Sequence, residues 1–423
     1  MIARFSVSNF LSIREKQAIN FLTTKDKTNK DLMAVEVANG IYINKMAIFF
    51  GANASGKSNI LKALETIFMM LSTPTADPRL GIRYYTPFEQ DNNSPVSMAI
   101  EFYYNGVKYN YDIRYNGRYI EEENLFYTPR RSKALFYSRR YAGEGVQPTI
   151  TFGNSLNIKQ KTKGSIRENT FNNNSVLSTA AKISLPDDAR EFVSLHAWIE
   201  KYVHNINGDR SISSYTAELN SINADLNKKK FYINLLAKAD FNIVDFKIVD
   251  NRATLPKEIV KTILTNSAIS EEDRVDLLNK VVFTNRSEKG NFDISIDYQS
   301  EGTLRFIELM NVLYDLITGN HIYFLDELGN RMHYDLIVYY LMLFLYNSDS
   351  SQLFFTSQSV LLLDEDFIRR DAVYLTEKDI ETASSSYKRV SDMGLHKNLS
   401  LYNAYRIGKL GSRPELGSPY LNV

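Results

Sequence analysis

Residues 46–58, Met46-Ala47-Ile48-Phe49-Phe50-Gly51-Ala52-Asn53-Ala54-Ser55-Gly56-Lys57-Ser58, decide the fold class. The five apolar residues at the start predict a strand that is buried on both faces. From Ser58 onward, apolar residues recur at helical spacing until Pro74. A buried strand, a glycine-rich loop ending in Lys-Ser, and a helix form the phosphate loop of P-loop proteins. The segment therefore predicts an α/β fold with a nucleoside-phosphate site.

Residue type predicts a role for each position of this loop. The glycines let the backbone curl so that its N–H groups point at phosphate oxygens, and the helix start adds the positive end of its dipole. Lys57 is expected to bridge the β and γ phosphates of ATP, and the Ser58 hydroxyl to bind Mg²⁺. The predicted nucleotide-contacting residues here are Gly51, Asn53, Ala54, Ser55, Gly56, Lys57, Ser58 and Asn59.

A second motif is the apolar stretch 321–325, which ends in Asp326 and Glu327. A carboxylate at the C-terminal end of a core strand faces the crevice in which α/β sheets bind their ligands. Asp326 suits the Mg²⁺ shell and Glu327 suits the polarisation of an attacking water. The pair predicts ATP hydrolysis, with Glu327 and Lys57 as catalytic residues.

A third motif, Ser300-Glu301-Gly302-Thr303, follows a predicted strand and precedes a helical run from Leu304 to Leu316. Ser300 and Gly302 are expected to form a second phosphate-binding helix end. Two protomers that hold ATP between them need such an end, each lending it to the other's γ phosphate. The motif therefore predicts assembly of the chain with itself.

Composition narrows the class of protein. The 423 residues include 50 Lys or Arg, 49 Asp or Glu, no Cys and five His. The absence of Cys excludes disulfides, Cys-ligated zinc, iron–sulfur clusters and thiol catalysis, and the near-neutral charge excludes a global attraction to nucleic acid. No apolar run is long enough to span a bilayer, so we expect a cytoplasmic protein that does not bind a membrane.

The remaining sequence predicts a flap, a basic segment and an arm. Two strand patterns around Asn105-Gly106 predict an antiparallel β flap beside the core. Residues 130–167 hold nine Lys or Arg and one acidic residue, which fits either a solvated segment or a DNA-binding surface with Tyr127, Phe136 and Tyr141 stacking on bases. Residues 187–239 read as two helices with a break near residues 207–209. The predicted domains are an N-terminal lobe 1–168, an inserted helical arm 169–239 and a C-terminal lobe 240–423.

At this point the chain resembles the ABC-type, SMC- and RecF-like ATPases, and within them the short-armed, AbiL-like AAA-type ATPases of bacterial abortive-infection and phage-defence systems. The resemblance spans nearly the whole chain. Its motifs are VSNFLSI (7–13), the phosphate loop, QSEGTLRF (299–306), FLDELGNRMH (324–333), LFFTSQSVLLL (353–363), IRRDAVYLTEKD (368–379) and YRIGKLGSRPEL (405–416). It implies that Lys57 and Ser58 belong to Walker A, Ser300 and Gly302 to the signature, and Asp326 and Glu327 to Walker B. Residues 330–333 would form the loop through which protomers communicate.

One position departs from the pattern of these relatives. Where they usually place a histidine, this chain has Gln358. An amide can donate a hydrogen bond to a γ-phosphate oxygen but carries no charge, so its stabilisation of the transition state is weaker. We therefore expect slow hydrolysis, with Gln358 as the third catalytic residue.

The resemblance implies an ATP- and Mg²⁺-dependent ATPase that assembles around ATP and regulates a partner effector, such as a nuclease, in anti-phage defence. Two alternatives stay open. One is a DNA-binding ATPase of repair or recombination that uses residues 130–167, and the other is a scaffold that binds nucleotide without turning it over.

Overall fold

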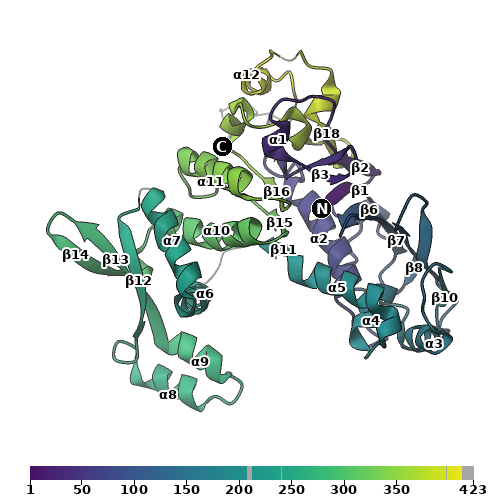
Figure 1. Cartoon of the computed structure of the whole chain (residues 1–423), viewed down its shortest axis with the longest axis horizontal. Helices are drawn as coiled ribbons and strands as arrows, with labels where there is room; N and C mark the ends of the chain where they lie inside the picture. Colours follow the sequence, from purple (N-terminus) through teal and green to yellow (C-terminus); the bar gives the residue numbers. More distant parts are fainter. Residues whose placement is uncertain (207–211, 240, 397, 412–423) are drawn as a thin grey trace, which may run out of the picture. The chain divides into compact units, whose positions relative to one another are not determined.

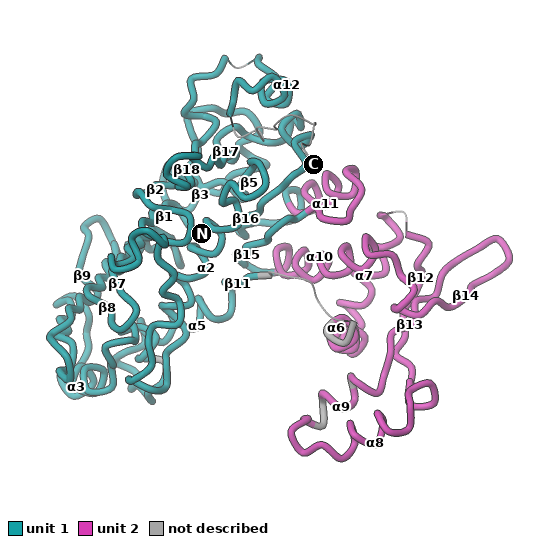
Figure 2. The backbone as a smooth tube through the Cα atoms, turned by 180° about the vertical axis from the view of Figure 1, so that it is seen from behind, with its two compact units in different colours: residues 1–206, 319–328, 345–423 teal, residues 207–318, 329–344 magenta. Residues whose placement is uncertain are grey.

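The protein divides into two compact units. The structure, a computed structural model, describes residues 1–206, 212–239, 241–396 and 398–411 (Figure 1). Unit 1 comprises residues 1–206, 319–328 and 345–423, and unit 2 comprises residues 207–318 and 329–344 (Figure 2). The phosphate loop and the Asp326-Glu327 pair lie in unit 1, whereas the Ser300 motif lies in unit 2.

The core of unit 1 is a six-stranded sheet of order β11-β15-β16-β5-β17-β18. Neighbouring strands are parallel from β11 to β17, and β18 is antiparallel to β17. The central strand β5 is almost completely buried, as its run of apolar residues predicts. The strands are β5 Met46–Gly51, β11 Val203–Ile206, β15 Ile322–Leu325, β16 Gln352–Thr356, β17 Val373–Lys378 and β18 Ser385–Arg389.

A second sheet of seven antiparallel strands, of order β10-β9-β8-β7-β6-β1-β2, confirms the predicted flap and extends it. Asn105 and Gly106, both with positive φ, form the tight turn between β6 and β7. The strands are β1 Ile2–Ser8, β2 Gln17–Asn20, β6 Val96–Tyr104, β7 Val107–Tyr115, β8 Ile120–Thr128, β9 Ala134–Arg140 and β10 Thr149–Phe152. A short antiparallel pair, β3 Ala34–Ala38 and β4 Ile41–Asn44, forms a two-stranded sheet of its own.

Helix α2, Lys57–Ser72, joins the two sheets in one hydrophobic core. Its apolar residues cover more than one face, which suits a helix with a sheet on either side. The ring of Phe68 lies 6.2 Å from that of Phe102 in the antiparallel sheet and 6.3 Å from that of Phe324 in the core sheet. The helix that begins at the phosphate loop is therefore held by buried packing along its length.

The basic segment 130–167 supplies strands β9 and β10 of this sheet and runs into helix α3, Gln160–Asn169. Arg139 lies in β9 and is completely buried. Phe136 is also completely buried and Tyr127 is 8% exposed, so the prediction that these two rings stack on bases is wrong. Six of the nine cations of the segment are exposed: Arg130, Arg131, Lys133, Arg140, Lys159 and Lys161. The misassignment arose because Arg139 and Arg140 are adjacent at the end of β9, and only the pairing of the strand decides that Arg139 points inward and Arg140 outward.

The two helices predicted within residues 187–239 are three in the structure, and they fall in different units. Helix α5, Arg190–Tyr202, belongs to unit 1, where it is followed by β11 at the edge of the core sheet. Helices α6, Ile212–Ala224, and α7, Leu226–Lys238, belong to unit 2. The predicted break at residues 207–209 lies outside the described residues. The first break between the compact units falls after residue 206, at the end of β11, which pairs with β15. The predicted lobes and arm, with boundaries at residues 168 and 239, stay a prediction.

Unit 2 combines helices with a three-stranded antiparallel sheet of order β12-β13-β14. Its sheet consists of β12 Ile243–Asp250, β13 Asn279–Ser287 and β14 Gly290–Ser295, and helices α8 Lys257–Thr265 and α9 Glu271–Leu278 lie between β12 and β13 in the chain. Helix α10, Glu301–Thr318, and the first part of α11, Tyr334–Asn347, complete the unit. Across the described ranges of both units, no helix has the length and apolar character needed to cross a membrane.

Candidate nucleotide-binding site

The phosphate loop leaves β5 and turns into α2 in the conformation that its residues predict. Gly56, the N-cap of α2, has φ +103°, and Ala54 has φ +61°. A side chain at Gly56 would collide with the Ser385 hydroxyl and approach that of Ser12 to 2.8 Å. Glycine is therefore required at this position for both its backbone angle and its space. Asn53 and Ala54, at the top of the loop, are exposed.

Lys57 lies inside the loop and is only 7% exposed. Its ammonium donates hydrogen bonds of 2.8 Å to the carbonyls of Gly51 and Ala52. Burial lowers the pKa of Lys57, and the charges of Glu327 and Asp326 act in the opposite direction. A cation enclosed by a curled backbone in this way is suited to a polyanionic phosphate chain.

The Asp326 carboxylate is the junction between the loop and the neighbouring strands. Its Oδ1 accepts a hydrogen bond of 2.9 Å from the Ser58 hydroxyl and one of 2.6 Å from the Thr356 hydroxyl. Ser58 lies in the first turn of α2, Asp326 follows β15, and Thr356 ends β16, the strand between β15 and β5. Parallel strands whose C-terminal ends share one edge of the sheet thus bring together residues 268 positions apart.

Glu327 is held by contacts on both its backbone and its side chain. Its N–H donates to the Thr356 hydroxyl over 2.8 Å, and its Oε1 accepts a 2.5 Å hydrogen bond from the Gln358 amide. Its φ of +50° is a left-handed conformation that residues other than glycine seldom adopt and that tends to occur at functional sites. Gln358 is exposed and therefore links the acid to the surface of the site.

The residues present fit a bound Mg²⁺ ion. Mg²⁺ prefers oxygen donors and commonly keeps few protein ligands, taking the others from phosphate and water. Ser58 and Asp326 offer a hydroxyl and a carboxylate oxygen that already meet at 2.9 Å. Among the described residues no cluster of three or more His, Cys, Asp or Glu is placed to hold a metal.

Thr356 received no role from the sequence, although it contacts both predicted acids. It is fully buried, its hydroxyl donates to Asp326 and accepts from Glu327, and its carbonyl accepts from the N–H of Leu328 over 3.2 Å. The sequence signal for a role of Thr356 in the site was a polar residue at the end of an apolar strand. That signal becomes specific only when the strand is known to lie beside the Asp326 strand.

Asn59, by contrast, directs its side chain toward the N-terminal turn. Its amide donates a 2.7 Å hydrogen bond to the Ser12 hydroxyl. The Ser55 hydroxyl is buried and makes no hydrogen bond within the described structure. Asn59 and Ser55 are therefore two of the eight predicted nucleotide-contacting positions, and their side chains are directed into the protein.

Ser300 and Gly302 lie in unit 2, at the start of α10. The exposed Ser300 hydroxyl accepts a 3.1 Å hydrogen bond from the N–H of Thr303 and so caps the helix. A side chain at Gly302 would approach the Arg331 carbonyl to 2.7 Å. Residues 330–333 and the signature motif are therefore in direct contact within unit 2.

Residues 46–364 match the model of a protein family described as "AAA domain, putative AbiEii toxin, Type IV TA system". The match covers three quarters of the chain, including the phosphate loop, the Ser300 motif and the Asp326-Glu327 pair. The chain belongs to this AAA family. No curated protein matches this AAA protein significantly.

The chain is also similar to three solved structures, each at 15% sequence identity or below. An SMC head domain from Thermotoga maritima is 11% identical, with 92% of this chain and 98% of that one covered and a TM-score of 0.39. The SMC head bound to the C-terminal winged-helix domain of ScpA is 15% identical, with 96% and 99% covered and a TM-score of 0.41. An SMC head with an extended coiled coil, bound to the C-terminal domain of ScpA derived from Pyrococcus furiosus, is 12% identical, with 97% and 98% covered and a TM-score of 0.38.

Proposed function

We propose that this AAA protein binds ATP with Mg²⁺ at residues 51–58 and hydrolyses it slowly. The observation that carries the proposal is the hydrogen bond from Ser58 to Asp326, because it places a carboxylate at the hydroxyl that ends the phosphate loop. Lys57 would hold the β and γ phosphates, and Ser58 and Asp326 would hold the metal, which supplies charge neutralisation when bound. Membership of the AAA family supports the same reaction.

Glu327 is the proposed general base and Gln358 its partner. A carboxylate fixed through its backbone by Thr356 and through Oε1 by Gln358 is suited to orienting one water molecule for attack on the γ phosphate. Because the Gln358 amide is neutral, it would stabilise the developing charge less than a cationic donor would. Slow turnover, with the ATP-bound state as the long-lived state, follows from this arrangement.

The proposed working form is a dimer or larger assembly that holds ATP between copies of the chain. Ser300 and Gly302 would supply the N-terminal end of α10 to the γ phosphate bound by another copy. The exposed Ser300 hydroxyl at the start of this 18-residue helix supports the assignment. In the proposed role the assembly regulates a toxic effector, such as a nuclease, in anti-phage defence. The family description, which names a toxin and a toxin–antitoxin system, supports the link to toxicity.

The experiment is steady-state ATP hydrolysis by the purified protein with Mg²⁺, with and without linear duplex DNA, using Lys57→Ala as the background. Slow hydrolysis above this background that is indifferent to DNA is the expected result. Hydrolysis no faster than that of Lys57→Ala would contradict the proposed reaction. Strong stimulation by DNA would instead favour the repair alternative, for which the exposed Arg130, Arg131, Lys133 and Arg140 would be the contact residues.

A further inference from the structure

Side chains of β18 donate hydrogen bonds to two backbone carbonyls of the phosphate loop, which lies about 330 residues earlier in the chain. The Ser385 hydroxyl donates a 2.6 Å hydrogen bond to the Ser55 carbonyl. The Tyr387 hydroxyl donates one of 2.7 Å to the Gly56 carbonyl. Ser385 is 1% exposed and Tyr387 8% exposed, so neither bond competes freely with water.

The hydrogen bonds at Ser385 belong to a chain whose direction can be deduced. The Asn59 amide donates to the Ser12 hydroxyl over 2.7 Å, and the Ser12 and Ser385 hydroxyls lie 2.7 Å apart. The Ser385 hydroxyl has a single proton and donates it to the Ser55 carbonyl. Ser12 must therefore be the donor in its hydrogen bond with Ser385. The chain therefore runs from Asn59 through Ser12 and Ser385 to the loop, with every hydroxyl both donating and accepting.

Planarity of the peptide bond makes these carbonyl contacts relevant to phosphate binding. In a trans peptide, the carbonyl oxygen of one residue and the N–H of the next point in opposite directions within one rigid plane. Fixing the Ser55 carbonyl therefore fixes the direction of the Gly56 N–H. Fixing the Gly56 carbonyl in the same way directs the Lys57 N–H. Both N–H groups are ones that a phosphate loop turns toward its ligand.

We propose that Ser12, Asn59, Ser385 and Tyr387, here termed the loop clasp, are positioning residues that hold the phosphate loop in its ATP-binding conformation. Three of the four lie outside residues 46–364, so the family match does not include them. The proposal rests on the proposed function, because it assigns a role to residues behind the proposed ATP site. Burial raises the pKa of Tyr387, so its hydroxyl stays protonated and remains a donor at working pH.

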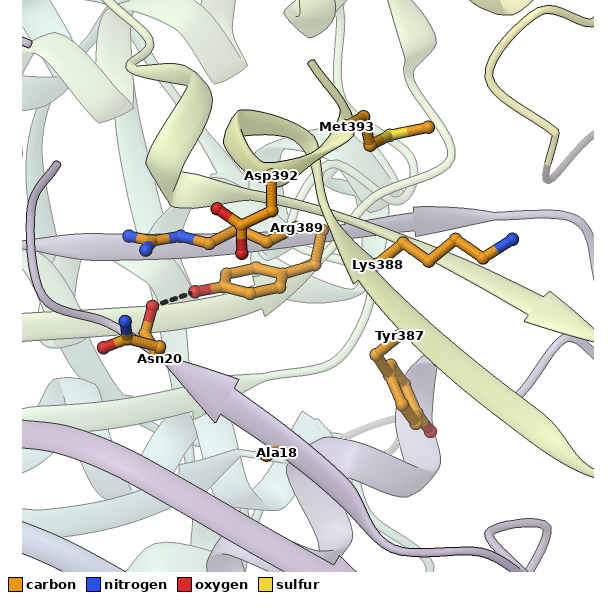
Figure 3. A pocket seen from close by; sticks show the side chains of 8 residues that line it. Ala18, Asn20, Tyr387, Lys388, Arg389, Asp392 and Met393 are labelled. Carbon is orange, nitrogen blue, oxygen red and sulfur yellow. Dashed lines mark hydrogen bonds between the residues drawn. The ribbon is translucent and has the colours of Figure 1, made fainter.

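The chain offers a matched control in the neighbouring strand. The Tyr374 hydroxyl of β17 also donates a 2.7 Å hydrogen bond to a backbone carbonyl, that of Asn20. Asn20 lies in β2, away from the phosphate loop in the chain. Both tyrosines line a pocket of about 330 Å³, in which Figure 3 shows Tyr387 pointing away from Asp392 and Arg389. Replacing either Tyr with Phe removes one hydroxyl and keeps the ring.

The experiment measures the Kd of ATP with Mg²⁺ by titration calorimetry, together with kcat, for the wild type, Tyr387→Phe, Tyr374→Phe and Lys57→Ala. We expect Tyr387→Phe to raise the Kd about 3- to 10-fold, as loss of one hydrogen bond predicts, with kcat at saturating ATP changed less than twofold. Tyr374→Phe should leave the Kd within about twofold. Ser385→Ala, which frees the Ser55 carbonyl, should weaken binding in the same direction as Tyr387→Phe. Thermal unfolding of each variant establishes that the fold is kept.

The outcomes separate the two proposals. If wild type binds ATP and Lys57→Ala does not, but Tyr387→Phe and Ser385→Ala both bind like Tyr374→Phe, the loop clasp is overturned and the ATP site stands. A fall in kcat at unchanged Kd would also overturn it, because that pattern indicates a smaller active fraction. If wild type binds ATP no better than Lys57→Ala, the proposed ATP site fails, and the loop clasp fails with it.

Discussion

Thr356 is the residue on which the geometry of the two acids depends. Because its hydroxyl serves Asp326 and Glu327 at once, Thr356→Val would leave a buried N–H and a carboxylate oxygen short of a partner. We expect a loss of about 1–3 kcal/mol in the free energy of unfolding, and a roughly 10- to 100-fold fall in kcat with little change in the Kd of ATP. Denaturant unfolding and steady-state kinetics measure the two effects.

Thr376 provides the control for this substitution. It is fully buried in β17, on the other side of β5, and its hydroxyl has no hydrogen-bond partner among the described residues. Thr376→Val should therefore be neutral or slightly stabilising and should leave kcat within about twofold. Equal losses of kcat in the two variants would show that Thr356 acts only through packing.

Gln358 allows a direct test of why turnover should be slow. Gln358→His would place a donor that can carry charge beside Glu327, and hydrogen bonds from charged donors are about twice as strong as neutral ones. We expect kcat to rise at least about tenfold, while Gln358→Leu, which cannot donate, should lower it. A histidine variant that hydrolyses ATP no faster than the wild type would contradict this account of the site.

Asp371 forms a buried ion pair with Arg369 in which the two side chains are 1% and 2% exposed. Burial by itself would raise the pKa of Asp371, but hydrogen bonds from Arg369 and Thr24 and the Arg369 charge outweigh it, so the pKa lies below its ordinary value of 3.8. The stabilisation is therefore present above about pH 3.8 and is lost as the pH falls through the lower folded-state pKa.

Asp371→Asn should cost about 3–5 kcal/mol near neutral pH, because the buried Arg369 charge loses its counterion. The difference in the free energy of unfolding between Asp371→Asn and the wild type should shrink below pH 3.8. As the pH falls, the wild-type carboxylate becomes protonated first in the unfolded state and then in the folded state. Unfolding curves at several pH values measure both trends. A difference that stayed constant across this range would show that the charge of Asp371 is not what stabilises the fold.

At the scale of elements, the antiparallel sheet is held to the following segment by two buried charged side chains on neighbouring strands, Arg139 and Glu123. Arg139 donates to the carbonyls of Ile120, Phe171 and Asn172, and Glu123 accepts from the Val176 N–H and from two tyrosine hydroxyls. Burial raises the pKa of Glu123, and the Arg139 charge opposes this rise. The pair thus joins strands β8 and β9 to the chain that leads into α4, Val176–Lys182.

Arg139→Met should therefore destabilise the protein by about 3–5 kcal/mol, because three carbonyls lose their donor and the buried Glu123 loses a nearby positive charge. The next residue supplies the control: the Arg140 side chain is 74% exposed and forms an ion pair with Glu122 over 3.4 Å. Arg140→Met should change stability by about 0.5 kcal/mol or less. Chemical denaturation compares the two, and equal effects would mean that burial of Arg139 does not matter. A DNA-binding test of the basic segment should accordingly spare Arg139.

At the scale of the whole molecule, ATP is expected to hold two or more copies together. Glu327→Gln keeps the shape of the acid but removes its charge, so it should bind ATP without turning it over and accumulate the assembled form. Light scattering with and without ATP and Mg²⁺ measures the mass. Ser300→Arg should prevent the ATP-dependent increase in mass while each copy still binds ATP. If Glu327→Gln keeps the mass of a monomer in the presence of ATP and Mg²⁺, the proposed assembly is refuted.

The local pattern of the chain determined the elements on which the site is built. Apolar runs and a change from strand to helical spacing predicted β5, the phosphate loop and α2, and the strand before Asp326-Glu327, because burial imposes these periodicities on nearby residues. Tertiary structure alone decided what those elements contact. Strand order brings Thr356 to the two acids, β18 brings Ser385 and Tyr387 to the loop, and pairing of β9 buries Arg139. A hydroxyl or a guanidinium has the same local signature on a surface as in a core, so only the pairing of distant strands shows which of the two it is.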